Sequence, residues 1–432
     1  MRAQPPLFLG IDFGTSGCRA LVIDAAGVTA ARSEVAVPPP VRPAPGWSEQ
    51  SPALWWAALT TVVTALPADV RATIAAVAVD GTSGTLLLAD EGGRPLGPAL
   101  LYDDGRAREQ ARALSRLAPA DTAVCSPSSS LAKALWLLAE PSCNARHLLH
   151  QADWVLGRLT GRFGTSDENN ALKLGYDPVG RCWPAWLAAT GLPPELLPDV
   201  RPVGDRVGAI APAVAAELGL PPDTLVVAGT TDSTAGAIAA GVAATADGVT
   251  TLGSTLVVKV LSDRPVFATR YGVYSHRLAG RWLVGGASNS GGAVLRQFFD
   301  PGELEALSAS IDPARPSTLD YYPLTRPGER FPIADPALPP RLEPRPADRA
   351  AFLHALLEGI ARIEALGYRR LAELGAPYPA RVLTTGGGAV NPTWTAIRAR
   401  HLGVPVTAAA QRDAAYGAAL LGRNGFTDGA AS

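Results

Sequence analysis

The stretch Gly10-Ile11-Asp12-Phe13-Gly14-Thr15-Ser16-Gly17 sets the interpretation of this chain. It lies between two apolar runs, residues 7–11 and 19–23, so we expect it to form the turn of a β-hairpin. Glycines allow a tight turn and a close approach to a ligand, and successive backbone N–H groups in such a turn can hold an anion. Its threonine and serine add hydroxyl donors, and Asp12 could hold a hydrated Mg²⁺. An ordinary hairpin turn explains the segment alone equally well.

Strands and helices alternate through the rest of the first half. Strands are expected at residues 28–35, 74–79, 86–89 and 225–227, and helices at residues 54–66, 106–117, 131–139 and 147–159. Proline-rich loops are expected between residues 159 and 225. The buried strand 74–79 runs into Asp80-Gly81-Thr82-Ser83-Gly84-Thr85.

The second half repeats the opening pattern. An apolar strand at 249–252, the turn Gly253-Ser254-Thr255 and a strand at 256–261 echo the N-terminal hairpin. Strands at 282–284 and 381–384 follow, with helices at 234–240, 348–374, 392–402 and 414–421. Strand hairpins followed by helices, twice over, predict an α/β protein of two related domains with a cleft between them.

Composition excludes several classes of protein. The chain has 432 residues, 47% of them hydrophobic, and a formal net charge of −1, so neither a disordered chain nor a nucleic-acid surface is indicated. No signal peptide and no apolar run of about 18 residues is present, so we expect a cytoplasmic protein with no membrane partner. The cysteines, expected to be reduced thiols, are Cys18, Cys125, Cys143 and Cys182. Of the 38 basic residues only Lys133, Lys173 and Lys259 are lysines.

Two further segments carry chemistry. Gly229-Thr230-Thr231-Asp232-Ser233-Thr234 places one carboxylate between a strand and a helix. Such an aspartate can accept the proton of an attacking hydroxyl group, although it serves equally well as a helix cap. Gly386-Gly387-Gly388, followed by Asn391, offers bare backbone against which a flat heterocycle can lie. Walker A, dinucleotide-binding GxGxxG, GxSxG and HExxH motifs are absent.

In combination, these segments resemble the actin-like ATPase and sugar-kinase superfamily, and within it the FGGY carbohydrate kinases over nearly the full length. The resemblance also rests on further motifs, namely Gly46-Trp47-Ser48-Glu49-Gln50, Tyr102-Asp103-Asp104-Gly105-Arg106, the run 128–137, Leu159-Thr160-Gly161, the run 166–171, Gly328-Glu329-Arg330 and the run 357–361.

The resemblance implies two ribonuclease H-like domains with the active site in the cleft. Residues 1–239 would form the sugar-binding domain, with a C-terminal helix at 413–432 packing back on it, and 240–412 the nucleotide-binding domain. Asp232 would be the general base, and Asp12 would lie near Mg²⁺ and the substrate. The nucleotide would be ATP, held by Gly14, Thr15, Ser16, Gly253, Ser254, Thr255, Gly387, Gly388 and Asn391. The domains would close on their ligands, in a monomer or a homodimer.

The segment Gly81-Thr82-Ser83-Gly84-Thr85 governs the expected substrate. Bacterial xylulose kinases tend to carry G-Q-M-H-G here and glycerol kinases N-Q-R-E, whereas this segment resembles a compact subgroup of D-ribulose kinases. We therefore expect a D-ribulose kinase, with Ser83 bonded to the sugar, ahead of another pentulose kinase such as xylulokinase and then a polyol kinase. An actin-like ATPase and a catalytically silent sugar-binding regulator are the alternatives from other classes.

Overall fold

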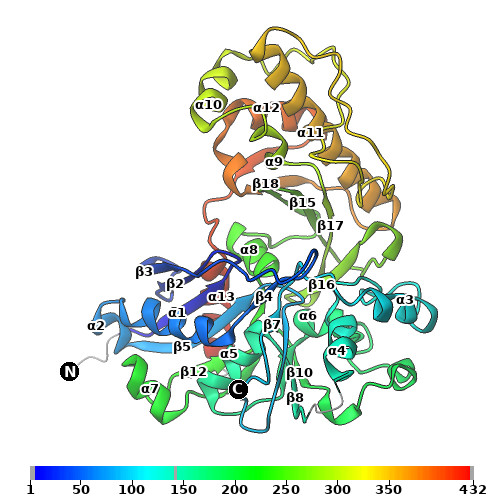
Figure 1. Ribbon diagram of the computed structural model, residues 1–432. Coiled ribbons are helices and arrows are strands. Elements are labelled where there is room, and N and C mark those ends of the chain that lie inside the picture. Colours follow the sequence, from blue (N-terminus) through cyan, green and yellow to red (C-terminus); the bar gives the residue numbers. More distant parts are fainter. Residues whose placement is uncertain (1–4, 141–143, 429–432) are drawn as a thin grey trace. The chain divides into compact units, whose positions relative to one another are not determined.

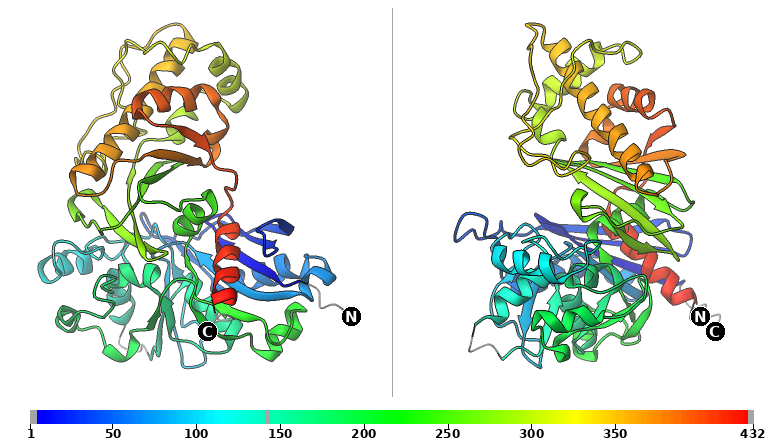
Figure 2. Two further views of the ribbon diagram at one scale, coloured as in Figure 1. Left: turned by 180° about the vertical axis from the view of Figure 1, so that it is seen from behind. Right: turned by 90° about the vertical axis from the view of Figure 1, so that its right-hand side faces the viewer.

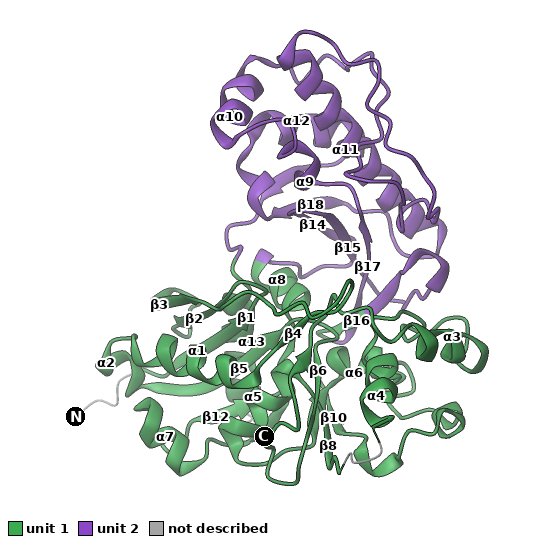
Figure 3. Cartoon of the chain, viewed as in Figure 1, with its two compact units in different colours: residues 1–239, 276–279, 413–432 green, residues 240–275, 280–412 purple. Residues whose placement is uncertain are grey.

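The computed structural model describes residues 5–140 and 144–428, so Cys143 and the end of the expected 413–432 helix lie outside the described residues. The chain divides into two compact units (Figure 3). The first comprises residues 1–239, 276–279 and 413–432, and the second comprises residues 240–275 and 280–412.

A mixed sheet forms the centre of the first unit (Figure 1). Its order is β11-β12-β5-β1-β2-β3, and β13 also pairs with β5. Strand β1 is antiparallel to β2 and parallel to β5, which is parallel to β12. The strands are β1 (Leu7–Phe13), β2 (Gly17–Ile23), β3 (Thr29–Ala36), β5 (Ile74–Gly81), β11 (Arg206–Ala209), β12 (Leu225–Val227) and β13 (Thr230–Thr231).

Both faces of this sheet are covered, because alternate residues of a strand point to opposite sides. Leu9 and Ile11 pack in one core with side chains of α1 (Pro52–Thr64), whereas Phe8 packs in another with side chains of α13 (Ala414–Asp428). Gly10 faces α13 so closely that a Cβ there would lie 1.9 Å from the Ala415 carbonyl oxygen. The left view of Figure 2 shows α13, in red, along the blue strands.

The remaining elements of the first unit surround this sheet. A smaller sheet has the order β4-β7-β6-β8, and β9 pairs with β10. These elements are β4 (Glu49–Gln50), α2 (Ala68–Arg71), β6 (Leu86–Ala89), β7 (Ala99–Leu100), α3 (Arg108–Leu117), α4 (Ser130–Leu138), β8 (His147–His150), α5 (Gln151–Thr160), β9 (Thr165–Asp167), α6 (Glu168–Ala171), η1 (Leu172–Leu174), η2 (Ala185–Thr190), η3 (Pro194–Leu196), β10 (Asp199–Arg201), α7 (Pro212–Leu218) and α8 (Asp232–Ala240).

Two expectations for this region were wrong. The helix expected at residues 147–159 begins only at Gln151, because the preceding residues pair with β6 as strand β8. His150 ends that strand and caps the helix, with its backbone N–H and its Nδ1 both bonded to the Asp153 carboxylate. The region expected to be loops contains α7, which starts with Pro212 at a favourable first-turn position.

The second unit repeats the strand arrangement of the first. Its sheet has the order β16-β17-β15-β14-β18-β19, with β14 antiparallel to β15 and parallel to β18. Strand β18 is parallel to β19, so β14, β15, β18 and β19 correspond to β1, β2, β5 and β12. The strands are β14 (Asp247–Leu252), β15 (Leu256–Ser262), β17 (Arg281–Ser288), β18 (Arg381–Thr385), β19 (Val406–Ala408) and the edge strand β16 (Tyr274–Leu278), whose residues 276–278 are counted with the first unit.

Helices cover this second sheet and are locked to it by a buried ion pair. The helical elements are η4 (Thr269–Tyr271), α9 (Gly292–Leu295), α10 (Pro301–Ser310), α11 (Arg349–Glu373), η5 (Gly387–Val390) and α12 (Pro392–Leu402). Arg398 of α12 donates two hydrogen bonds, of 2.6 and 2.7 Å, to Glu364 of α11. Glu364 also accepts a bond of 2.6 Å from Thr250 of β14, so both helices are tied to one strand. Within the described part of the chain, no helix has the length and apolar character needed to cross a membrane.

Candidate active site

Three parallel strands of the first unit end at one edge of its sheet and carry polar residues there. Asp12 of β1 pairs in register with Asp80 of β5, and Asp80 pairs with Thr230 of β13. Asp232 follows two residues after Thr230, at the start of α8. The fold therefore brings Asp12 and Asp232, two of the expected site residues, to the same edge, and it adds Asp80 between them.

Asp12 is a buried carboxylate with one cationic neighbour. It is 4% exposed, and its Oδ2 accepts a hydrogen bond of 2.8 Å from Nη1 of Arg19 on β2. Burial raises the pKa of Asp12, and the neighbouring Asp80 and Arg19 side chains oppose that rise. Sequence reasoning missed Arg19, which faces Asp12 because the two residues pair across the hairpin.

Asp80 is the second residue that sequence reasoning missed. Its carboxyl group is completely buried, and burial raises its pKa well above the ordinary value, with the charges of Asp12, Asp232 and Asp413 adding to the rise. Both of its carboxyl oxygens are buried without a hydrogen-bond partner among the described residues, so nothing offsets the cost of a negative charge there. Of the two carboxyl groups, Asp80 is therefore the one that keeps its proton to the higher pH, because its pKa is raised further than that of Asp12. The signal was its position directly after a fully apolar strand.

The turn after Asp80 carries Ser83. Gly84 has a φ of +86°, which favours glycine, and Thr85 N–H donates to the Thr82 carbonyl oxygen at 3.2 Å. Thr82 Oγ1 lies 2.6 Å from Thr85 Oγ1. The Ser83 hydroxyl is buried and has no hydrogen-bond partner among the described residues. A buried donor without a partner is costly, which makes this hydroxyl available to a ligand.

Asp232 occupies the first turn of α8. Its Oδ1 accepts a hydrogen bond of 2.6 Å from the backbone N–H of Ser233, the next residue, whereas a helix cap accepts from an N–H two or three residues on. The residue remains partly exposed, and its negative charge contributes to the raised pKa of Asp80. The bond to Ser233 uses one oxygen of the carboxylate, and the other oxygen can still accept a proton.

The first expected phosphate turn is a short β-hairpin turn. Gly14 N–H donates to the Gly17 carbonyl oxygen at 3.0 Å, and the hydroxyl-bearing residues Thr15 and Ser16 between them are exposed. The Arg19 guanidinium would lie 3.4 Å from a Cβ at Gly14, so a cation adjoins the turn. Backbone N–H groups, hydroxyl groups and a guanidinium suit a phosphate group.

The second expected phosphate turn lies between β14 and β15 of the second unit. Gly292 N–H donates to Gly253 O at 2.9 Å, and Ala293 N–H donates to Ser254 O at 3.1 Å. Arg296 Nη2 donates to Ser254 Oγ at 2.7 Å, which again places an arginine beside the turn. The sequence carried no signal for this arginine, because it depends on the close packing of two distant glycine segments.

The glycine triplet packs beside that second turn. A Cβ at Gly386 would lie 2.6 Å from Leu252 O, and one at Gly388 would lie 2.7 Å from the Trp394 ring, whereas Gly387 faces open space. Asn391 caps α12 by accepting from Trp394 N–H at 2.9 Å, and its Nδ2 donates to Ser308. The side chain of Asn391 is thus used in capping, which leaves Gly387 as the open position.

The carboxylates of the first unit do not form a protein-only metal cage. In residues 5–140 and 144–428, no three or more histidine, cysteine, aspartate or glutamate side chains are grouped to hold a metal ion. Mg²⁺ is usually held by one or two carboxylates together with substrate phosphates and water. Asp12, followed by the hydroxyls of Thr15 and Ser16, supplies the oxygen donors that such an ion prefers.

We expect Asp80→Asn to stabilise the protein at neutral pH. Between its ordinary pKa of 3.8 and its raised folded value, Asp80 holds a proton in the folded state that it loses on unfolding. The free energy of unfolding of the wild type therefore falls as the pH rises, whereas asparagine keeps the donor and removes this dependence. The Tm difference between variant and wild type should grow from pH 5 to pH 8. The exposed control Asp69→Asn should show a Tm difference that does not change with pH. The same constant difference for Asp80→Asn would contradict the raised pKa of Asp80.

Comparison with known proteins identifies relatives of this chain. The curated relatives include a glycerol kinase from Gloeobacter violaceus, 33% identical over 209 residues, which are 45% of this chain and 41% of that protein. A xylulose kinase from Klebsiella pneumoniae is 29% identical over 202 residues, 44% of this chain and 41% of the relative. The matched part of this chain thus spans about two fifths of the length of these relatives.

A solved structure and two family models cover more of the chain. The structure of a xyloylose kinase from Brucella ovis superposes with a TM-score of 0.88 at 27% identity, covering 98% of this chain and 91% of that one. The predicted fold class, two ribonuclease H-like domains, is thereby confirmed. The model for the N-terminal domain of the FGGY family of carbohydrate kinases matches residues 7–239, and the model for its C-terminal domain matches residues 248–423. This chain belongs to the FGGY family of carbohydrate kinases.

Proposed function

We propose that this protein is an ATP-dependent sugar kinase that converts a ketopentose, D-ribulose in the first place, to D-ribulose 5-phosphate and ADP. The buried Ser83 hydroxyl, which lacks a partner among the described residues, supports this proposal most directly. It follows the strand that carries Asp80, beside the strands that lead to Asp12 and Asp232. A sugar bonded to Ser83 would satisfy this hydroxyl next to two carboxylates able to orient other hydroxyl groups.

The chemistry divides between the two sets of residues. Asp232 accepts the proton of the C5 hydroxyl group as that oxygen attacks the γ-phosphorus, and the bond from phosphorus to the β–γ bridging oxygen breaks to release ADP. The turns at Gly14–Ser16 and Gly253–Thr255 hold the phosphates, and Gly387 borders the adenine. Mg²⁺, when bound at Asp12, neutralises phosphate charge.

D-Xylulose is the second candidate sugar, because xylulose kinases are among the relatives and the solved structures. The turn Thr82-Ser83-Gly84-Thr85 favours D-ribulose through its likeness to the D-ribulose kinase subgroup. A polyol ranks third, because this turn does not carry the N-Q-R-E side chains typical of glycerol kinases.

The test of the function is a screen of sugars for ADP release. Purified protein with MgATP is assayed against D-ribulose, D-xylulose, L-ribulose, ribose, glycerol and ribitol. We expect D-ribulose to give the highest kcat/KM and to yield D-ribulose 5-phosphate. A preference for D-xylulose or a polyol would correct the substrate. ADP release that no sugar stimulates would point to an actin-like ATPase, and sugar binding without any ADP release to a silent regulator.

Asp232→Asn should remove most of the sugar-dependent turnover. Asparagine keeps an oxygen for the bond from Ser233 N–H but cannot accept the substrate proton. Loss of a general base lowers a rate by roughly 10²- to 10⁴-fold, so kcat should fall by that order with the Tm unchanged. Exposed Asp199→Asn in the same unit is the control and should keep wild-type kinetics. Retention of most of the turnover by Asp232→Asn would assign the base to another carboxylate.

Ser83→Ala should weaken use of the sugar without weakening the fold. The hydroxyl has no partner to lose among the described residues, so the Tm should hold or rise slightly. A lost hydrogen bond of about 0.5–1.5 kcal/mol lowers kcat/KM for the sugar by roughly two- to tenfold. The KM for ATP should not change. Ser166→Ala, which removes another buried hydroxyl without a partner in the described chain, is the matched control. A fall of several degrees in Tm with intact sugar kinetics would make Ser83 structural.

A further inference from the structure

The turn that carries Ser83 is anchored on both sides of that residue. Before it, Gln151 Oε1 accepts hydrogen bonds from Thr82 N–H at 3.0 Å and from Thr82 Oγ1 at 2.9 Å. After it, the Gly84 carbonyl oxygen accepts a bond of 2.9 Å from Lys133 Nζ. The direction of the Ser83 side chain therefore depends on two distant side chains, one from α5 and one from α4.

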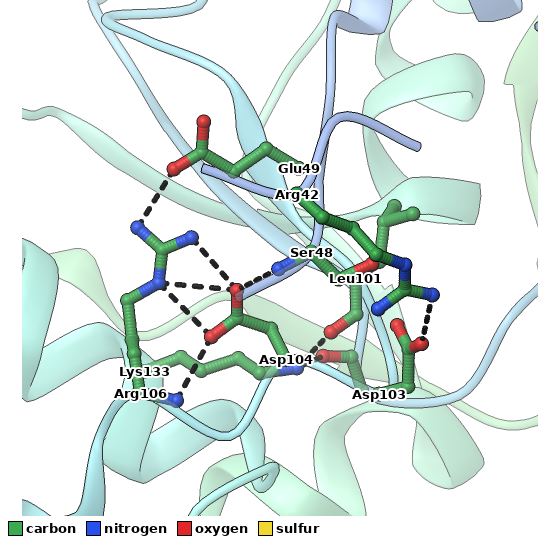
Figure 4. A network of polar contacts seen from close by, with 9 residues as sticks. Arg42, Ser48, Glu49, Leu101, Asp103, Asp104, Arg106 and Lys133 are labelled. Carbon is green, nitrogen blue, oxygen red and sulfur yellow. Dashed lines mark hydrogen bonds and ion pairs between the residues drawn. The ribbon is translucent and has the colours of Figure 1, made fainter. Parts of the chain in front are cut away.

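Lys133 reaches the turn from inside the first unit. Its side chain has no exposed surface, and Nζ donates a second hydrogen bond to the Leu101 carbonyl oxygen. Leu101 N–H donates to Ser48 O at 2.9 Å, and Ser48 N–H donates to Asp104 at 2.6 Å. Figure 4 shows Lys133 ending at the Leu101 carbonyl group beside this network. The anchor of the turn is thus part of a connected set of polar contacts.

Arg106 connects the residues around Lys133 through ion pairs and ring contacts. Arg106 binds Asp104 through its Nε and Nη2 atoms, at 3.0 Å and 2.7 Å, and its Nη1 lies 2.7 Å from Glu49. The Trp47 ring lies 3.7 Å from the guanidinium carbon, and the Trp136 ring of α4 lies 4.9 Å from it. Because α4 carries both Trp136 and Lys133, this stacking also fixes the helix from which Lys133 extends.

The lysines of this chain are concentrated near Gly84. Lysine occupies three of the 38 basic positions of the chain, yet two of the three lysines lie at Gly84. Lys133 bonds to the carbonyl group of Gly84, and the Lys173 side chain would lie 3.4 Å from a Cβ placed there. A guanidinium stays charged and is planar, whereas an amine can lose its charge and directs compact donors to two carbonyl groups. A lysine side chain therefore suits this buried position better than an arginine side chain would.

We propose that Lys133 is a positioning residue for sugar recognition, which holds the Gly84 carbonyl group and so directs the Ser83 hydroxyl toward the substrate. This inference rests on the proposed function, since it takes Ser83 as a sugar-binding residue. Lys133 itself touches no substrate and acts through the turn.

The charge of Lys133 makes the anchor sensitive to pH near neutrality. Burial lowers the pKa of Lys133 to about 7, and the positive charge of Lys173 lowers it further, as does that of Arg106, whereas Asp104 and Asp103 oppose the shift. A protonated amine donates stronger hydrogen bonds than a neutral one. As the pH rises through 7 the anchor weakens, so the KM for the sugar should rise.

The test is a double-mutant cycle of Lys133→Met and Ser83→Ala, with sugar kinetics measured from pH 6 to pH 8.5 at saturating ATP. Lys133→Met should raise the sugar KM roughly tenfold, the order expected for a lost charge-assisted bond, and leave the ATP KM unchanged. The double variant should lose far less than the product of the two single losses, because both changes disable one contact. The rise of the sugar KM above pH 7 should be absent in Lys133→Met. Lys259→Met, another buried lysine but in the second unit, should leave the sugar KM unchanged.

Each outcome bears on the inference separately from the function. Losses that multiply, or an unchanged sugar KM in Lys133→Met, would overturn the role of Lys133 while leaving a sugar kinase in place. An inert Ser83→Ala would remove Ser83 from the sugar site and overturn the inference, whereas the kinase activity itself is decided by the screen of sugars for ADP release. If Lys133→Met fails to fold, the pH profiles of the wild type and Ser83→Ala decide. The profile of Ser83→Ala should be flat where that of the wild type rises, and parallel profiles would refute the inference.

Discussion

Two buried carboxyl groups side by side at the ends of β1 and β5 constrain the rest of the first unit. Parallel pairing in register places Asp12 directly beside Asp80, and burial in the sheet leaves neither group enough water to ionise at low cost. The raised pKa of Asp80 and the guanidinium of Arg19, which bonds to Asp12, resolve the conflict. The hairpin must therefore bring β2 alongside β1 with Arg19 opposite Asp12, and it does so.

The elements that could be predicted from sequence are those whose signal is local. The helix at Pro392–Leu402 was predicted with its observed bounds, because Asn391 caps it and proline opens it. The long helix Arg349–Glu373 was predicted nearly to its ends, although Asp348 lies at its cap position, bonded to Ala350 N–H, and not inside the first turn. Helix α5 was placed too early, because a strand pairing with β6 claims the residues before it.

The candidate site shows the same division. The glycine, serine and threonine turns and Asp232 could be found because each stands out in its own segment. Arg296, Arg19 and Lys133 could not, since their roles arise only when a distant turn folds against them. The sequence shows that lysine is scarce, but it gives no role to Lys133 or Lys173, because that role depends on their contacts at Gly84.

The order of elements along the chain also governs how the first unit is made. Helix α13, residues Ala414–Asp428, covers one face of the sheet that begins at Leu7, and Gly10 receives it at backbone contact. The whole second unit is synthesised between these partners. During translation the Phe8 face of the sheet therefore stays without its helix until the last turns of the chain emerge. Domains usually fold as units in order of synthesis. Here the second unit can complete its core before the first, although its sequence comes later.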